Sequence, residues 1–297
     1  DSADLSLNIS REVLQHDYQL KLIAKNIEKK IKNELAKLLK TDRDKYIKFF
    51  EAFGSQLKLG VYADFGRHSD ELKDLLMFYS STEKRLVTLG EYVDRMKDEQ
   101  TSILYACGET IDKIDMLPQA DSLKDKGYEV LYLTEGIDEF ALKMLQRYKE
   151  KDFANICADD VDLDTQEEKD AINKENETAK DMLDFMKESL DGAVQSVRFT
   201  NKLKNHPVCL TSEGDVSVEM EKVLNTLPGE ENKVKAQIVL EINAEHPVAQ
   251  KLKALYDSDK NKVADYARIL YSVARLIGGM SVENPTELSN LVCDLMV

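Results

Sequence analysis

Residues 101–148 read TSILYACGETIDKIDMLPQADSLKDKGYEVLYLTEGIDEFALKMLQRY, and this stretch shows most clearly what kind of fold the chain adopts. Two short runs rich in β-branched and aromatic residues, 101–106 and 128–133, enclose a helix-like segment that ends near Gly127, and helical spacing follows at 138–148. Strand, helix, strand and helix in this order predict a small α/β layer with a parallel pair of strands. The stretch has neither a G-x-G-x-x-G nor a P-loop glycine pattern, so the layer does not imply nucleotide binding.

Helical spacing dominates the rest of the chain. Apolar residues recur at three- and four-residue steps between Ile23 and Leu39, which predicts a long amphipathic helix with a lysine-rich opposite face. A solvated face is the simplest interpretation of these lysines, and an anion-binding patch is the alternative. Residues 194–200 and 234–242 have the composition of strands. Further helices are expected at 46–53, 70–79, 179–190, 247–256, 260–277 and 286–296.

A strongly acidic stretch divides the chain. Residues 159–191 contain 13 acidic and 4 basic side chains, a net charge of −9 out of −15 for the whole chain. Such a segment repels itself and buries little, which is typical of a mobile junction. We therefore expect one domain at 1–158, an acidic junction at 159–178 and a second domain at 179–297. The fold class is α+β and helix-rich, with a helical segment, a small α/β/α subdomain, and a mixed α/β domain that ends in a helical hairpin.

Composition excludes several classes of protein. The 297 residues carry a net charge of −15, which disfavours nucleic acid and anionic membranes as partners. The four cysteines form no C-x-x-C pair and the four histidines have no metal-ligand spacing, so we expect reduced thiols and no metal site. No apolar run is long enough to span a bilayer and no secretory signal is evident, so a cytoplasmic protein is expected. The first residue is not Met, which suggests a fragment of a longer protein.

The N-terminal stretch DSADLSLNISREVLQ, residues 1–15, resembles a loop at the end of the larger part of the middle domain in the heat shock protein 90 chaperones. The resemblance implies that Arg11 reaches the γ-phosphate of ATP held by a separate N-terminal domain, assisted by Gln15. A guanidinium suits this role because its fixed donors match phosphate oxygens and stabilise the charge that spreads over them. Ser6 stands where the family usually has proline. Taken alone, the motif would be an ordinary surface pair of Arg11 and Glu12.

Three further stretches resemble the same family and follow in the family's order. They are LGEYVDRMKDEQTSILYACGE at 89–109, GYEVLYLTEGIDEF at 127–140 and LEINAEHPV at 240–248, where Ala244 and Glu245 replace the usual Pro-Asp. The terminal DLMV lacks the acidic pentapeptide of cytosolic eukaryotic members, so bacterial members are the better match. The resemblance implies a middle-domain tail and a dimerisation domain of a chaperone that couples binding and hydrolysis of ATP with Mg to client folding. We expect no nucleotide bound to this chain alone, and no ATP hydrolysis by it.

The resemblance also implies a surface for unfolded client proteins. One part would be Glu139, Phe140 and Lys143. The other would be an amphipathic helix whose apolar residues form one stripe, and a methionine in such a stripe adapts to varied partners. By periodicity alone the stripe is a core face, and only the resemblance favours exposure. The stripe consists of Val216, Met220, Val223, Leu224 and Leu227.

The last two predicted helices indicate a homodimer. Each has an apolar face, and a helical hairpin of this kind is buried either on its own domain or on a second copy, where two hairpins make a four-helix bundle. The expected interface consists of Tyr266, Ile269, Leu270, Val273, Ile277, Leu288, Leu291 and Leu295.

Two other functions remain open from the sequence. One is a structural assembly protein that dimerises through its C-terminal helices and has no nucleotide role. The other is a small-molecule enzyme built on the α/β layer, although no cluster of convergent polar residues is evident there. The expected partners are a second copy, unfolded or partly folded clients and co-chaperones.

Overall fold

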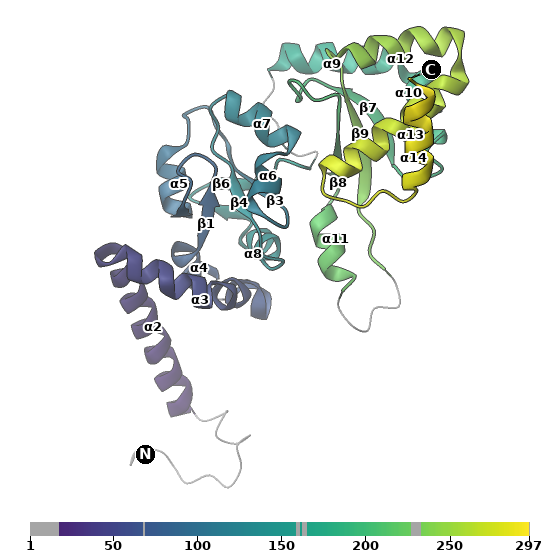
Figure 1. The fold of residues 1–297 in the computed structure, drawn as a ribbon. Helices are drawn as coiled ribbons and strands as arrows, with labels where there is room; N and C mark the ends of the chain where they lie inside the picture. Colours follow the sequence, from purple (N-terminus) through teal and green to yellow (C-terminus); the bar gives the residue numbers. More distant parts are fainter. Residues whose placement is uncertain (1–17, 68, 159–160, 162–164, 227–232, 297) are drawn as a thin grey trace. The chain divides into compact units, whose positions relative to one another are not determined.

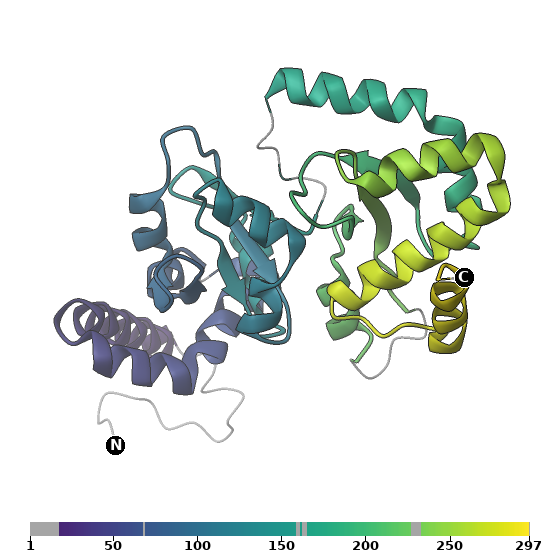
Figure 2. The same cartoon turned by 45° about the horizontal axis from the view of Figure 1, so that its top comes forward.

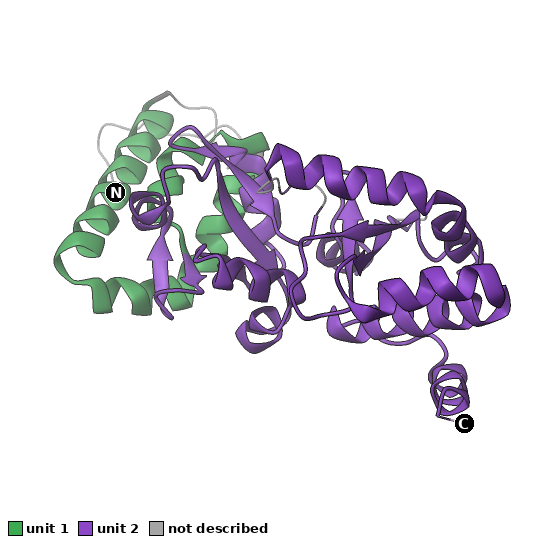
Figure 3. Ribbon diagram, turned by 90° about the horizontal axis from the view of Figure 1, so that it is seen from above, with its two compact units in different colours: residues 1–77 green, residues 78–297 purple. Residues whose placement is uncertain are grey.

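The computed structural model describes residues 18–67, 69–158, 161, 165–226 and 233–296. The chain divides into two compact units, residues 1–77 and 78–297 (Figure 3). Arg11 and Gln15 lie outside the described residues. The division falls at Met77, and the boundaries expected around the acidic stretch stay predictions.

The first unit contains two long helices followed by short helical turns. The second helix begins after the N-cap Asp42, whose carboxylate accepts a hydrogen bond from the Lys45 N–H. The core of this unit includes Tyr46, whose fully buried ring places its hydroxyl 2.5 Å from the Leu75 carbonyl oxygen that accepts its hydrogen bond. The elements are α2 Tyr18–Thr41, α3 Arg43–Tyr62, η1 Ala63–Gly66, α4 Ser69–Leu72 and η2 Lys73–Leu75.

The second unit opens with a six-stranded sheet in the order β2-β1-β4-β3-β6-β5. The predicted parallel pair is confirmed, because Tyr105 of β3 is in register with Leu131 of β4. Strand β6 also runs parallel to β3, while β1 and β5 are antiparallel to their neighbours β4 and β6. The strands are β1 Met77–Ser80, β2 Leu86–Thr88, β3 Ser102–Cys107, β4 Leu131–Leu133, β5 Arg147–Tyr148 and β6 Lys151–Asn155.

Helices connect these strands and bury their apolar faces on the sheet. Ile114, Ala120 and Leu123, from the two helices between β3 and β4, pack with Leu104 and Tyr132 in one core. The helices are α5 Leu89–Arg95, α6 Ile111–Asp115, α7 Pro118–Asp125 and α8 Asp138–Leu145.

Helix α8 is shorter than the helical spacing at 138–148 predicts. It ends at Leu145, and Gln146 adopts a positive φ of 60°. The chain then forms the β5–β6 hairpin through Lys149 and Glu150, which both have positive φ. Neither residue is the glycine or asparagine that normally signals such a turn, so the pattern did not reveal the hairpin.

Part of the acidic stretch is helical. Composition predicts a mobile junction at 159–178, but helix α9, Gln166–Thr178, occupies 13 of these 20 residues, including the entire second half. The helix begins with a capping box, in which the Thr165 hydroxyl accepts from the Glu168 N–H and the Glu168 carboxylate accepts from the Thr165 N–H. This local signal offsets the charge repulsion that the composition indicated.

The C-terminal part of the second unit is a three-stranded sheet in the order β7-β9-β8 (Figures 1 and 2). Strand β9 is parallel to β7 and antiparallel to β8. Helices α10, α12 and α13 bury one face of this sheet in a continuous core, whereas α11 stands apart from them (Figure 1). The elements are α10 Lys180–Glu188, β7 Ser196–Thr200, β8 Val208–Glu213, α11 Val218–Leu224, β9 Gln237–Asn243, α12 Pro247–Ser258, α13 Lys260–Ile277 and α14 Pro285–Asp294.

The arrangement confirms a helix-rich α+β fold. Among the residues that the structure describes, no helix is both long and apolar enough to cross a membrane.

Candidate functional site

Helix α11 carries an apolar stripe that its own chain leaves partly open. The described stripe residues Val216, Met220, Val223 and Leu224 are all half-buried, and no side chain of the helix is fully buried. Leu227 lies outside the described residues. A core helix would bury its apolar side chains almost completely, so α11 presents apolar surface to solvent.

The start of α11 is fixed by a serine that the sequence-based prediction omits. Ser217 is the N-cap, and its Oγ accepts a hydrogen bond from the Met220 N–H at 3.1 Å. Serine directly before a helical run is a known N-cap signal, so this residue could have been found from the sequence.

Helix α8 supplies the second half of the expected client surface. Phe140 is half-buried, and Lys143 is exposed with its Nζ 2.6 Å from the Asp215 carbonyl oxygen, to which it donates. A Cβ placed on Gly136, just before this helix, would lie 3.0 Å from a methyl carbon of Val223. The start of α8 therefore contacts the segment that contains α11.

Glu139 does not lie at the surface, contrary to the role that the resemblance implies. Its side chain belongs to the buried set, with 3% of the residue exposed. One carboxylate oxygen, Oε1, accepts hydrogen bonds from Tyr105 Oη at 3.2 Å and Asn155 Nδ2 at 2.9 Å. The other, Oε2, accepts from Ser217 Oγ. Within α8, the side chain of Glu139 points towards Tyr105 of β3 and Asn155 of β6.

A small cavity of about 60 Å³ is lined by two of the three donors to this carboxylate, Asn155 and Ser217. Three cysteines, Cys107, Cys157 and Cys209, line it as well. Burial raises the pKa of Cys157 to about 12, and burial together with the charge of Glu139 raises the pKa of Cys107. Burial, with a contribution from Glu241, also raises the pKa of Cys209. These thiols stay protonated near neutral pH, so they are not activated nucleophiles.

The expected dimer residues divide into two groups in the structure. On α13, Ile269 and Leu270 are buried within their own chain, and Leu270 belongs to the core on the three-stranded sheet. Tyr266 and Val273 pack against the same core and are partly buried, and Ile277 is half-buried. Little of Ile269 and Leu270 is exposed, and Leu270 helps to cover its own sheet, while the contact of these residues with a second copy stays a prediction.

Helix α14 and the end of α13 have a different environment. No side chain of α14 is fully buried, Leu288 and Leu291 are half-buried, and Leu295 is 46% exposed. Leu276, in the last turn of α13, is 55% exposed. Each of these side chains leaves apolar area open within a single chain.

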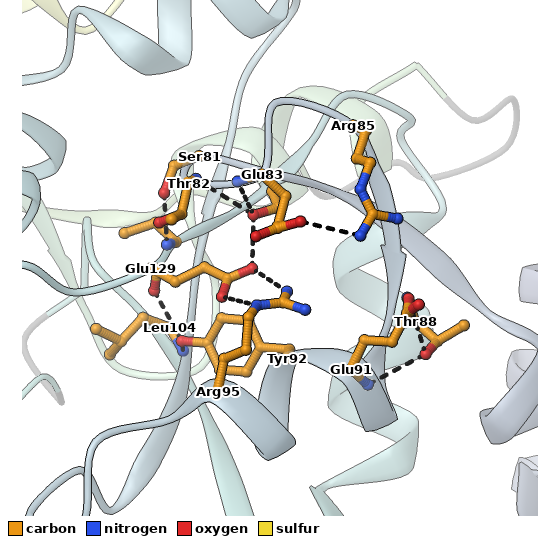
Figure 4. A network of polar contacts seen from close by, with 12 residues as sticks. Ser81, Thr82, Glu83, Arg85, Thr88, Glu91, Tyr92, Arg95, Leu104 and Glu129 are labelled. Atoms are coloured by element: carbon orange, nitrogen blue, oxygen red, sulfur yellow. Dashed lines mark hydrogen bonds and ion pairs between the residues drawn. The ribbon is translucent and has the colours of Figure 1, made fainter.

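The stretch at 89–109 contributes Tyr92, Arg95 and Leu104 to a polar network (Figure 4). The Arg95 guanidinium forms two hydrogen bonds to the Glu129 carboxylate, at 3.0 Å and 2.7 Å. Tyr92 donates to the Glu129 carbonyl oxygen at 2.8 Å and accepts from the Leu104 N–H at 3.0 Å. Ser80 Oγ donates to the same carboxylate at 2.5 Å. The network joins α5 to β1, β3 and Glu129, two residues before β4, and so has a structural role.

The histidines and acidic groups indicate no catalytic centre in the described parts of the chain. His246 is the N-cap of α12, where its Nδ1 accepts from the Val248 N–H at 3.2 Å. His16 and His68 lie outside the described residues. Within the described ranges, no group of three or more His, Cys, Asp or Glu side chains is arranged to hold a metal ion.

Comparison with known proteins covers the entire chain. Residues 1–297 match the family model described as "Hsp90 protein". The chain is 55% identical over 296 residues to the "Chaperone protein HtpG" of Clostridium botulinum. It is 54% identical to the proteins of the same name from Bacillus subtilis and Halalkalibacterium halodurans. Each match covers 100% of this chain and 47% of the relative, so the chain spans about half the length of the curated relatives it matches.

Proposed function

Because the chain belongs to the heat shock protein 90 family, we propose that it is the part of a molecular chaperone that holds client proteins and joins two copies. The observation that carries this proposal is the partly open apolar stripe of α11. Unfolded polypeptides expose apolar side chains, and burying these against a half-exposed stripe is favourable at about 25 cal/mol per Å².

The proposed client surface combines α11 with the neighbouring side of α8. It consists of Phe140, Val216, Met220, Val223 and Leu224, with Leu227 as a further candidate outside the described residues. Met220 suits varied clients because a thioether side chain adapts its shape. Lys143 lies at the edge of this surface, where its ammonium group also contacts the Asp215 carbonyl.

Suppression of aggregation tests this surface. The double variant Met220→Asp with Leu224→Asp should suppress the aggregation of heat-denatured citrate synthase less well than the parent chain, because two carboxylates oppose burial of the stripe. Lys222→Glu is the matched control, since it changes the net charge of α11 by the same two units and leaves the stripe intact. Equal suppression by the parent and the double variant would contradict a client surface on α11 and favour a structural assembly protein.

The second part of the proposal is a homodimer formed through α14 and the end of α13. Leu276, Leu291 and Leu295 supply apolar area that a single chain leaves partly open. A symmetric pair of such hairpins would cover both surfaces at once. This proposal places most of the contact on α14 and the end of α13, since Ile269 and Leu270 expose little area.

The third part concerns the whole protein, of which this chain spans only part. We infer that Arg11 contacts the γ-phosphate of ATP bound with Mg by another domain, with Gln15 assisting, and that the intact protein couples ATP hydrolysis to client folding. The support is the sequence motif and the family membership. A guanidinium stabilises the charge that spreads over the transferred phosphoryl oxygens. Co-chaperones and a cytoplasmic location belong to the same proposal.

A further inference from the structure

The carboxylate of Glu139 is held by three donors from three different elements. Tyr105 from β3 and Asn155 from β6 donate to Oε1, and Ser217 donates to Oε2. Only 3% of the residue is exposed. A carboxylate that is buried and accepts several hydrogen bonds is stabilised in one position, and removing the Ser217 hydroxyl takes away the donor to Oε2, which is costly for a buried oxygen.

Ser217, the donor to Oε2, has two roles. Its Oγ accepts from the Met220 N–H as the N-cap of α11, and its single hydroxyl proton goes to Glu139. A serine hydroxyl has one proton and two lone pairs, so donation to Glu139 leaves a lone pair free to accept from the helix. The carboxylate thereby orients the hydroxyl in the way that the N-cap requires.

We propose that Glu139 is a positioning residue that fixes the start of α11, and with it the client stripe, against α8 and the six-stranded sheet. The inference rests on the proposed client surface and deepens it, because it assigns Glu139 to the support of the surface rather than to contact with the client. Only 3% of Glu139 is exposed and both carboxylate oxygens already accept hydrogen bonds within the chain, so the residue presents almost no surface to a bound polypeptide.

Two further contacts hold the segment of α11 against α8 and its preceding loop. The Lys143 ammonium donates to the Asp215 carbonyl just before the helix, and Gly136 approaches Val223 so closely that a Cβ there would lie 3.0 Å from its methyl carbon. In the sequence, Glu139 lies between Gly136 and Lys143, the residues that make these two contacts. Loss of its carboxylate should therefore loosen the helix at its start while the flanking contacts keep it near its place.

The cysteine-lined cavity provides a reporter of this seating. Cys157 lines the same cavity as Asn155 and Ser217, two of the three donors to Glu139. Cys293 is exposed on the last helix and serves as an internal reference for thiol labelling. If α11 loosens, a thiol reagent should reach Cys157 faster relative to Cys293.

Hydrogen exchange on the full chain is the primary test. In Ser217→Ala, amides 218–222 should exchange about fivefold faster than in the parent, because the helix loses its N-cap. The exchange of amides 239–242 of β9 should stay unchanged. Glu139→Ala should give the same local pattern and faster labelling of Cys157. Ser217→Thr keeps the hydroxyl and should restore slow exchange. Glu109→Ala, which removes an exposed glutamate in the same α/β part, is the matched control.

Suppression of citrate synthase aggregation then shows whether Glu139 supports the client surface or contacts the client itself. The proposal expects Glu139→Ala and Ser217→Ala to weaken suppression together with the change in α11 exchange, and Ser217→Thr to restore both. Weaker suppression by Glu139→Ala with parental exchange in α11 would mean that Glu139 touches the client, and the proposal would be overturned. Parental exchange in Ser217→Ala would overturn it as well, even if Glu139→Ala failed to fold.

These outcomes are distinct from failure of the client surface itself. If Met220→Asp with Leu224→Asp leaves suppression unchanged, the proposed function fails, but exchange at 218–222 still reports whether Glu139 seats the helix.

Discussion

Glu241 at the centre of β9 accepts two hydrogen bonds from the guanidinium of Arg198 on β7, from Nε at 2.9 Å and Nη2 at 2.6 Å, both to Oε1. The two residues are directly in register across the parallel strands. On the other side of β9, Cys209 of β8 is in register with the same glutamate, and its thiol lies 3.5 Å from Oε2. With 1% of Glu241 exposed, this carboxylate depends on Arg198 for its compensating charge.

Removing Arg198 should therefore destabilise the C-terminal sheet. Arg198→Met leaves a buried carboxylate without its cation, and we expect the free energy of unfolding to fall by about 2 kcal/mol, below the full range for buried pairs because the arginine is partly exposed. Urea denaturation measures the change. The control Arg147→Met breaks the exposed pair with Asp152 and should change stability by less than about 0.5 kcal/mol. Equal losses of unfolding free energy in the two variants would show that burial of Glu241 does not increase the cost of removing its partner.

The raised pKa of Cys157 predicts a loss of stability at alkaline pH. The pKa of Cys157 is about 12 in the folded chain against an ordinary value of 9.0. Above the ordinary value, the unfolded chain releases a proton that the folded chain retains. The contribution of the Cys157 thiol to the free energy of unfolding is thus fully present below about pH 8.5 and is lost as the pH rises towards 12.

Urea denaturation at pH 8 and about pH 10.5 measures this effect. Cys157→Ala should lose less unfolding free energy between the two pH values than the parent chain, and Cys293→Ala serves as the control for removing an exposed cysteine. An identical pH dependence in the parent and in Cys157→Ala would contradict the prediction.

The β5–β6 hairpin can be stabilised. Lys149 and Glu150 have φ values of 46° and 62°, a left-handed conformation that is unfavourable for both side chains. Lys149→Asn with Glu150→Gly fits this turn better and should raise the free energy of unfolding by about 1 kcal/mol. The exposed pair of Lys149 with Asp94 is lost but contributes little. Thermal denaturation checks the gain, and Glu150→Ala, which keeps the strain, should show none.

The dimer surface can be tested on α14 without disturbing the core. Leu291→Asp with Leu295→Asp should yield monomers by light scattering, because both side chains are partly open in the single chain and would be buried by a second copy. Ser289→Asp adds a charge to an exposed position of the same helix and should leave the mass unchanged. A dimer that survives the double substitution would place the interface elsewhere.

The phosphate contact requires the intact protein. Arg11→Ala in the full-length chaperone should lower ATP turnover by about 10- to 1,000-fold, while ATP affinity changes little, since the expected interaction forms mainly in the transition state. Arg11→Lys keeps the charge without the forked donors and should give an intermediate rate. Turnover of Arg11→Ala equal to that of the parent would remove the proposed nucleotide role.

Local patterns in the sequence determined most of the secondary structure. The β-branched runs at 101–106 and 128–133 predicted the parallel pair β3 and β4, and helical spacing predicted α12 and α13. The prediction failed where the decisive factor was not local. The hairpin of Lys149 and Glu150 has no turn residue, and β8 was not predicted because its pairing with β9 depends on a strand about thirty residues away.

The amino-acid sequence by itself established the family, the helix-rich α+β class and which helices have apolar faces, because these depend on ordered motifs and on periodicity. Only the tertiary structure decided which of those faces are covered. Periodicity makes Leu270 and Met220 alike, yet the sheet buries the first and leaves the second half-exposed. The same holds for Glu139, which the fold turns inward towards three donors. Burial depends on contacts between distant segments, and no local pattern encodes them.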